Sequence, residues 1–138
     1  MHRAANAYMQ THVITTTPGH LVVMLYDGAI TFLEQAKEEI QAKHYDKKGI
    51  LISQALDIIA ELDSSLNAEK GGELARNLHA LYMYCNTRLL MANLKMDTSL
   101  VDEVINILSS FRSAFAEINK VQIPPTMQNS NTPAYSHS

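Results

Sequence analysis

The chain lacks long hydrophobic runs and has one cysteine, Cys85, among its 138 residues. A single thiol cannot form an internal disulfide, which suits a reducing compartment and leaves the fold to rest on its apolar core. The longest apolar run, Leu21 to Tyr26, ends at Asp27 and falls far short of the ~20 residues that a membrane span needs. No apolar stretch of signal-peptide length follows the first residues, so neither membrane insertion nor secretion by that route is expected.

Basic charge is not in excess, because eleven Lys+Arg stand against fourteen Asp+Glu for a formal net charge of −3. A general nucleic-acid binder carries a basic surplus, so no nucleic-acid partner is expected. None of the six histidines follows a glutamate by three residues, which excludes the Glu-x-x-His pattern of di-iron bundles. Haem motifs, Gly-rich phosphate loops and nucleophile–base constellations are also missing. We therefore expect no metal, no cofactor and no catalytic site.

Proline is confined to positions near the ends of the chain: 18, 124, 125 and 133. The long stretch between them is free of the strongest helix breaker, and polar or glycine clusters near 43–49, 71–72 and 95–99 divide it. Apolar residues recur at helical spacing between these breaks. The pattern predicts four helices, at about 17–43, 46–66, 72–95 and 98–120. We expect Thr17 to cap the first helix. The last helix is expected to start near Asp97 or near Ser99, which would form a capping pair with Asp102.

Long helices joined by short linkers predict an all-α fold, an antiparallel up-down four-helix bundle over residues 17–121. Residues 1–16 are too short for a stable isolated helix and are predicted to dock as an N-terminal capping segment. Residues 122–138 contain no Lys, Arg, Asp or Glu, and they are predicted to form a disordered C-terminal tail.

Two predicted helices carry more apolar positions than one buried stripe accounts for. The first has a main stripe of Leu21, Leu25, Phe32, Ala36 and Ile40, and a second set of Val22, Tyr26, Ile30 and Leu33. The third has a stripe that begins at Leu74, and further apolar residues at Met83, Leu90, Met91 and Leu94. A surface helix normally has one apolar stripe. The second sets therefore need a cover, which is the N-terminal segment, a second copy of the chain or a partner polypeptide.

Two other functions stay open at this point. The run His44 to Gly49 partly resembles the His-x-x-Lys-Gly/Ser signature of histidine phosphotransfer bundles. However, Lys48 stands where a small residue is needed, and His44 falls at a predicted turn, which favours an ordinary solvated turn. The second alternative is a self-assembling structural bundle whose extra apolar face forms a homodimer.

Two blocks of sequence resemble the FliS family of flagellar secretion chaperones. Residues 17–30, TPGHLVVMLYDGAI, are similar to the family signature Ser-Pro-x-x-Leu-x-x-Met-Leu-Tyr-Asp-Gly-Ala-Ile. The second block runs from Gly71 to Leu78 and continues with Leu81-Tyr82-x-Tyr84 and Arg88-Leu89-Leu90-x-Ala92-Asn93. The resemblance extends from about Tyr8 to Ile118, nearly the whole folded part of the chain.

The resemblance implies a cytoplasmic, non-enzymatic four-helix chaperone. Such a protein binds the C-terminal segment of flagellin, prevents its premature polymerisation and assists its delivery to the flagellar type III export gate. In the family this segment becomes partly helical as it wraps around the bundle, which accounts for the surplus apolar positions. The resemblance also implies which residues line or support the binding grooves: Tyr8, Met24, Tyr26, Leu78, Tyr82, Met83, Arg88, Leu89 and Asn93. A homodimer of the cargo-free chain is left open.

Overall fold

The computed structural model describes residues 18–66 and 68–122. These residues form four helices and no strand: α2 (Pro18–Gln41), α3 (Tyr45–Ser64), α4 (Ala68–Lys95) and α5 (Thr98–Gln122). The predicted all-α fold class is confirmed. The predicted capping segment lies outside the described residues, and so does the predicted tail apart from Gln122, which ends α5.

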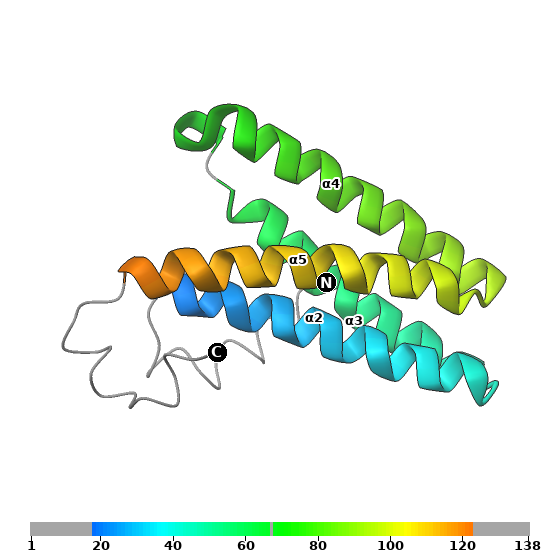
Figure 1. Cartoon of the computed structure of the whole chain (residues 1–138). Coiled ribbons are helices and arrows are strands. Elements are labelled where there is room, and N and C mark those ends of the chain that lie inside the picture. The colour runs from blue at the N-terminus through cyan, green and yellow to red at the C-terminus, as the bar shows by residue number, and fades with distance from the viewer. Residues whose placement is uncertain (1–17, 67, 123–138) are drawn as a thin grey trace, which may run out of the picture.

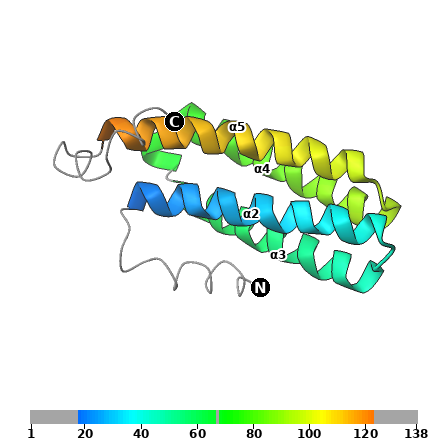
Figure 2. The same cartoon turned by 60° about the horizontal axis from the view of Figure 1, so that its bottom comes forward.

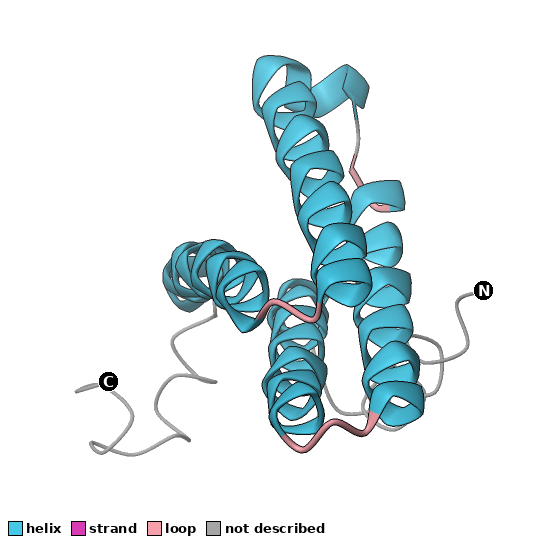
Figure 3. Ribbon diagram, turned by 90° about the vertical axis from the view of Figure 1, so that its right-hand side faces the viewer, coloured by secondary structure: helices cyan, strands magenta, loops and turns pink. Residues whose placement is uncertain are grey.

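The helices form a closed cycle in which α2 packs against α3, α3 against α4, α4 against α5, and α5 against α2. Neighbours run in opposite directions, as Figures 1 and 2 show, because the short connections leave no room for a crossover. Toward its N-terminal end α4 stands away from the other three helices (Figures 1 and 3). Among the described helices, none is both long and apolar enough to cross a membrane.

Residues with left-handed backbone conformation end two of the helices, Lys43 (φ 62°) after α2 and Met96 (φ 57°) after α4. After α2, the N–H groups of Lys43 and His44 donate to the carbonyls of Ile40 (3.0 Å) and Glu39 (2.9 Å). These two bonds form a Schellman motif, which satisfies carbonyl groups at a helix end and reverses the chain within a few residues.

Asp97 caps α5, because its Oδ1 accepts hydrogen bonds from the N–H (2.9 Å) and the hydroxyl (2.6 Å) of Ser99. These bonds lower the pKa of the Asp97 carboxyl group. Of the two predicted starts of this helix, Asp97 is confirmed, and the capping pair of Ser99 and Asp102 is wrong. Asp97 precedes the first residue of the helix, so its side chain reaches the second helical N–H, whereas Asp102 accepts a bond from Lys37 of α2 (2.6 Å).

The start of α4 also differs from the prediction. The helix begins at Ala68 but is interrupted at Gly72, whose φ of 53° and ψ of −125° are not helical. Glycine adopts a positive φ at little cost, since it has no Cβ. Leu74, which the apolar pattern placed in the buried stripe, is 66% exposed. That prediction is wrong because α4 diverges from its neighbours at this end (Figure 1).

Two tyrosines connect diagonally opposite helices inside the core. Tyr26 of α2 is 0% exposed and Tyr82 of α4 is 1% exposed, and their hydroxyl groups are hydrogen-bonded to each other. The ring centroid of Tyr26 lies 5.6 Å from that of Phe115 and 6.4 Å from that of Phe111, both on α5. Burial raises the pKa of both hydroxyl groups. Burial also raises the pKa of the nearby Cys85 thiol to about 11, so this cysteine packs as a neutral core residue.

Candidate partner-binding surface

The predicted site residues fall at different depths in the structure. Four of them lie in the core: Tyr26, Leu78, Tyr82 and Leu89. Three are half-buried, namely Met24, Arg88 and Asn93, while Met83 is 40% exposed. Tyr8 lies outside the described residues. The four core residues face the interior of the bundle in this structure, so their side chains are not exposed to a partner.

The surplus apolar residues of α2 are covered by the bundle itself. Tyr26 and Leu33 are fully buried, and Val22 and Ile30 pack half-buried against the core. The expectation that this helix needs an external cover is wrong for Tyr26 and Leu33, because α2 packs along both α3 and α5. Five of the eight large exposed hydrophobic residues in the described part of the chain lie on α4 instead: Leu74, Met83, Tyr84, Leu90 and Leu94.

Three of these residues belong to one continuous stripe along α4. Ala80, Met83, Thr87, Leu90 and Leu94 follow one another at spacings of three and four residues, and all five are exposed. We call this stripe the α4 seam. A three-four repeat places its residues on one side of a helix, which is the pattern by which helices pack in coiled coils. The seam contains no charged residue, and charge is depleted at the centre of protein interfaces. The α4 seam therefore has the spacing and the composition that packing against another helix requires.

A polar network closes the edge of α4 that faces α5. Arg88 Nε donates to Glu103 Oε1 at 2.7 Å, and the Tyr84 hydroxyl donates to Glu103 Oε2. The Arg88 guanidinium also lies 5.7 Å from the centroid of the Tyr84 ring. The hydrogen bonds from Tyr84 and from Arg88 lower the pKa of the Glu103 carboxyl group. Arg88, a predicted site residue, therefore ties two helices together in this structure.

Glu103→Gln is expected to lower the free energy of unfolding at pH 7 but not in acid. Since the pKa of Glu103 is lower in the folded than in the unfolded chain, its stabilising effect is complete above the ordinary carboxyl pKa, about 4.3. The effect is lost as the pH falls through the lowered value. Urea denaturation over a pH series measures it, with Asp57→Asn as control, because Asp57 is a half-buried acidic residue of α3 that lies outside this network. A difference in the free energy of unfolding between wild type and Glu103→Gln that stays constant with pH would show that the carboxylate charge does not contribute to stability.

The edge of α4 that faces α3 carries three polar residues at seven-residue spacing, His79, Asn86 and Asn93. The outer two are bonded to α3. His79 Nδ1 is hydrogen-bonded to Asp63 Oδ1 at 2.7 Å, and Lys48 Nζ donates to Asn93 Oδ1 at 2.5 Å and to its backbone carbonyl at 3.0 Å. Between them, Oδ1 of Asn86 is buried and has no hydrogen-bond partner among the described residues.

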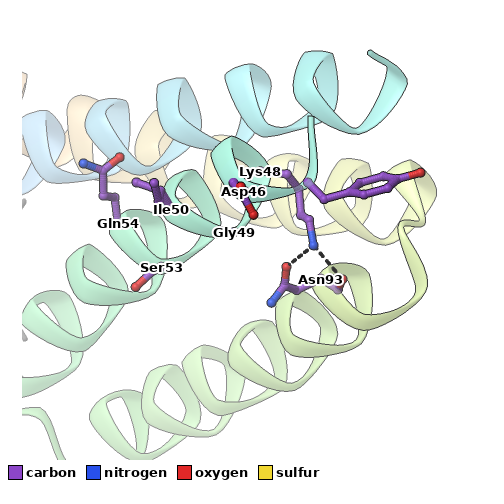
Figure 4. A pocket seen from close by; sticks show the side chains of 8 residues that line it. Asp46, Lys48, Gly49, Ile50, Ser53, Gln54 and Asn93 are labelled. Carbon is purple, nitrogen blue, oxygen red and sulfur yellow. Dashed lines mark hydrogen bonds between the residues drawn. The ribbon is translucent and has the colours of Figure 1, made fainter. Parts of the chain in front are cut away.

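Both ends of this edge are hollow. A pocket of about 520 Å³ lies where Lys48 meets Asn93, and its other walls come from the first turns of α3 (Figure 4). A second pocket of about 280 Å³ lies where Asp63 meets His79, and its lining includes Arg76. The α5 side of α4 is thus closed by a hydrogen-bonded network, whereas the α3 side offers recesses next to the α4 seam.

His44, the residue of the phosphotransfer alternative, lies between α2 and α3 at the N-cap position of α3. Its ring Nδ1 is hydrogen-bonded to Glu39 Oε2 at 2.8 Å. The side chain is exposed, but it sits at a turn of charged residues, as the sequence predicted, and no feature around it favours phosphotransfer.

Comparison with known proteins gives consistent results. The family model described as flagellar protein FliS matches residues 1–122. The chain is 39% identical over 111 residues to the flagellar secretion chaperone FliSB of Pseudomonas aeruginosa, covering 80% of this chain and 88% of the relative. It is 37% identical to FliS of Bacillus subtilis over 111 residues, covering 80% and 82%. It is also 37% identical to FliS of Salmonella typhimurium over 116 residues, covering 83% and 86%.

Proposed function

This chain belongs to the FliS family of flagellar secretion chaperones, and we propose that its cargo is the C-terminal segment of flagellin. In this proposal the chain works in the cytoplasm and acts by binding, without catalysis. It covers the flagellin segment and so prevents premature polymerisation, and it assists delivery of the cargo to the flagellar type III secretion apparatus.

The observation that carries the proposal is the exposed α4 seam. A stripe of uncharged residues at three-four spacing suits an amphipathic helix that lays its apolar face against α4, which is a common mode of peptide recognition. Leu90 is 58% and Leu94 81% exposed, so a bound helix would remove a considerable apolar area from water.

The cost of ordering the cargo segment favours its release. A segment that folds on binding spends part of the contact energy on its own ordering, so a large interface still gives a complex of moderate affinity. A chaperone that must hand its cargo to an export apparatus needs such a balance between coverage and release.

The test is a calorimetric titration of the chain with a peptide that comprises the flagellin C-terminal segment. We expect saturable binding with one peptide per chain, and circular dichroism of the mixture should show more helix than the sum of the two components. A peptide of the same composition in scrambled order is the control. Absence of binding heat at tens of micromolar peptide, or equal binding of the scrambled peptide, would contradict the proposal.

A further inference from the structure

We infer that Asn86 determines the register of the bound cargo helix: its side-chain amide pairs with a hydrogen-bond donor that the cargo presents at the middle of the α4 seam. This inference rests on the proposed function and adds a specificity-determining residue to it. Asn86 is not among the residues that the sequence resemblance pointed to.

The position of Asn86 in the seam is the first argument. In helix pairs of coiled-coil type, a side chain of one helix enters a hole formed by four residues of the other, at i, i+3, i+4 and i+7. Met83, Asn86, Thr87 and Leu90 have this spacing at the centre of the α4 seam. Met83, Thr87 and Leu90 are exposed and Asn86 is half-buried. A cargo side chain that enters this hole therefore meets Asn86 on the side toward α3.

The unpaired oxygen is the second argument. His79 and Asn93, seven residues before and after Asn86, are both bonded to α3, through Asp63 and Lys48. Oδ1 of Asn86 is buried and accepts no hydrogen bond from residues 18–66 or 68–122. Leu56, midway along α3 between Lys48 and Asp63, has a hydrocarbon side chain and offers no donor. The carbonyl of Asn86 therefore loses no hydrogen bond within the protein when it turns toward a donor of the cargo. The new bond removes the free-energy cost of a buried oxygen without a hydrogen bond.

The chemistry of the remaining seam residues shows why one polar position matters. Ala80, Met83, Leu90 and Leu94 accept apolar side chains in registers that differ by a whole heptad, since dispersion and burial are not directional. A single polar residue in an apolar seam selects one register, because every other register leaves it unpaired.

The occupant that fits is an amphipathic cargo helix with apolar residues at three-four spacing and one donor side chain opposite Asn86. Arg76 is exposed and lies one turn before Ala80, in line with the seam. A carboxylate at the corresponding end of the cargo helix complements this charge and orients the helix along α4.

The test is Asn86→Leu, which keeps the number and branching of the side-chain heavy atoms and removes the polar ones. We expect the free variant to unfold at a higher urea concentration than wild type, because the unpaired carbonyl is gone. We expect its affinity for the flagellin C-terminal peptide to fall roughly tenfold, as for one lost hydrogen bond in a desolvated position. Asn77→Leu, at an exposed α4 position outside the seam, is the matched control and should leave peptide affinity unchanged.

The expected gain in stability and loss of peptide affinity have opposite signs, which distinguishes a recognition residue from a structural one. If Asn86→Leu lowers stability and affinity together, or binds the peptide as tightly as wild type, the inference fails while the proposed function stands. If the wild-type chain binds no flagellin peptide, the proposed function itself fails. A series of peptides in which each donor side chain is replaced by alanine completes the test. One of these peptides should bind wild type roughly tenfold more weakly than the unsubstituted peptide does, and it should bind Asn86→Leu as well as the unsubstituted peptide does. If no peptide in the series behaves in this way, the inference is overturned.

Discussion

Lysine in place of both Leu90 and Leu94 is expected to weaken the complex with the flagellin peptide by roughly a hundredfold or more. Burial of a leucine side chain contributes about 1.5–3 kcal/mol, and the double variant loses two of them while placing two ammonium groups in a desolvated contact. The free protein should be almost unaffected, within about 0.5 kcal/mol of wild type, because both leucines are largely exposed. Lysine is a good helix former and suits the C-terminal turns of α4.

The matched control for this variant is Ile118→Lys. Ile118 is an apolar residue that is 53% exposed, but it lies on α5, outside the α4 seam. We expect the control to bind the peptide like wild type. Calorimetric titration measures affinity, and urea denaturation measures the free energy of unfolding. Equal losses of affinity in the double variant and the control, or no loss in either, would show that the α4 seam does not bind the peptide.

Alanine in place of Tyr82 is expected to lower the free energy of unfolding by about 3–5 kcal/mol, the range for a large aromatic residue removed from a packed core. Tyr82 is 1% exposed and fills the centre of the bundle, where its hydroxyl group meets that of Tyr26. Tyr84, two residues along the same helix, is 42% exposed. Tyr84→Ala should cost only about 1 kcal/mol, since it breaks one surface hydrogen bond. Comparable losses in the two alanine variants would show that Tyr82 is not a core residue.

The contribution of the hydroxyl pair can be separated by phenylalanine substitutions. Tyr82→Phe leaves the Tyr26 hydroxyl buried without its partner, at a cost of about 1–3 kcal/mol. Replacing Tyr26 and Tyr82 together by phenylalanine removes both polar groups and should recover most of that loss, because paired apolar groups of the same shape are nearly neutral. If Tyr82→Phe is as stable as wild type, the hydrogen bond between the two hydroxyl groups contributes nothing to stability.

The predictions for the Leu90 and Leu94 double variant and for Tyr82→Ala also separate the roles of the residues that the sequence resemblance assigned to binding. Tyr26, Leu78, Tyr82 and Leu89 are buried in the core, so a charged substitution there is expected to unfold the chain, and a loss of binding would follow from that. Leu90 and Leu94 lie on the surface, so their substitution tests binding directly.

The amino-acid sequence by itself determined the fold class and the four helices of the described residues, because these depend on local features. The confinement of proline to the ends, the breaks near 43–49, 71–72 and 95–99, and the spacing of apolar residues act within a few turns of chain. The family could be identified in the same way, since its signatures are continuous in sequence. The sequence left the cap of α5 open between Asp97 and Ser99, because several neighbouring residues are suitable caps and only the backbone geometry selects among them.

Only the tertiary structure decided which apolar faces are covered. Periodicity shows which residues share a face, but whether that face meets another helix depends on how the helices are placed, and long-range packing sets this placement. The second apolar set of α2 is covered because α2 lies along both α3 and α5, while the α4 seam remains exposed. The bond between Tyr26 and Tyr82, 56 residues apart, and the unpaired oxygen of Asn86 follow from the same placement. A local pattern contains no information about partners on other helices, so the exposed α4 seam could be recognised only in the assembled bundle.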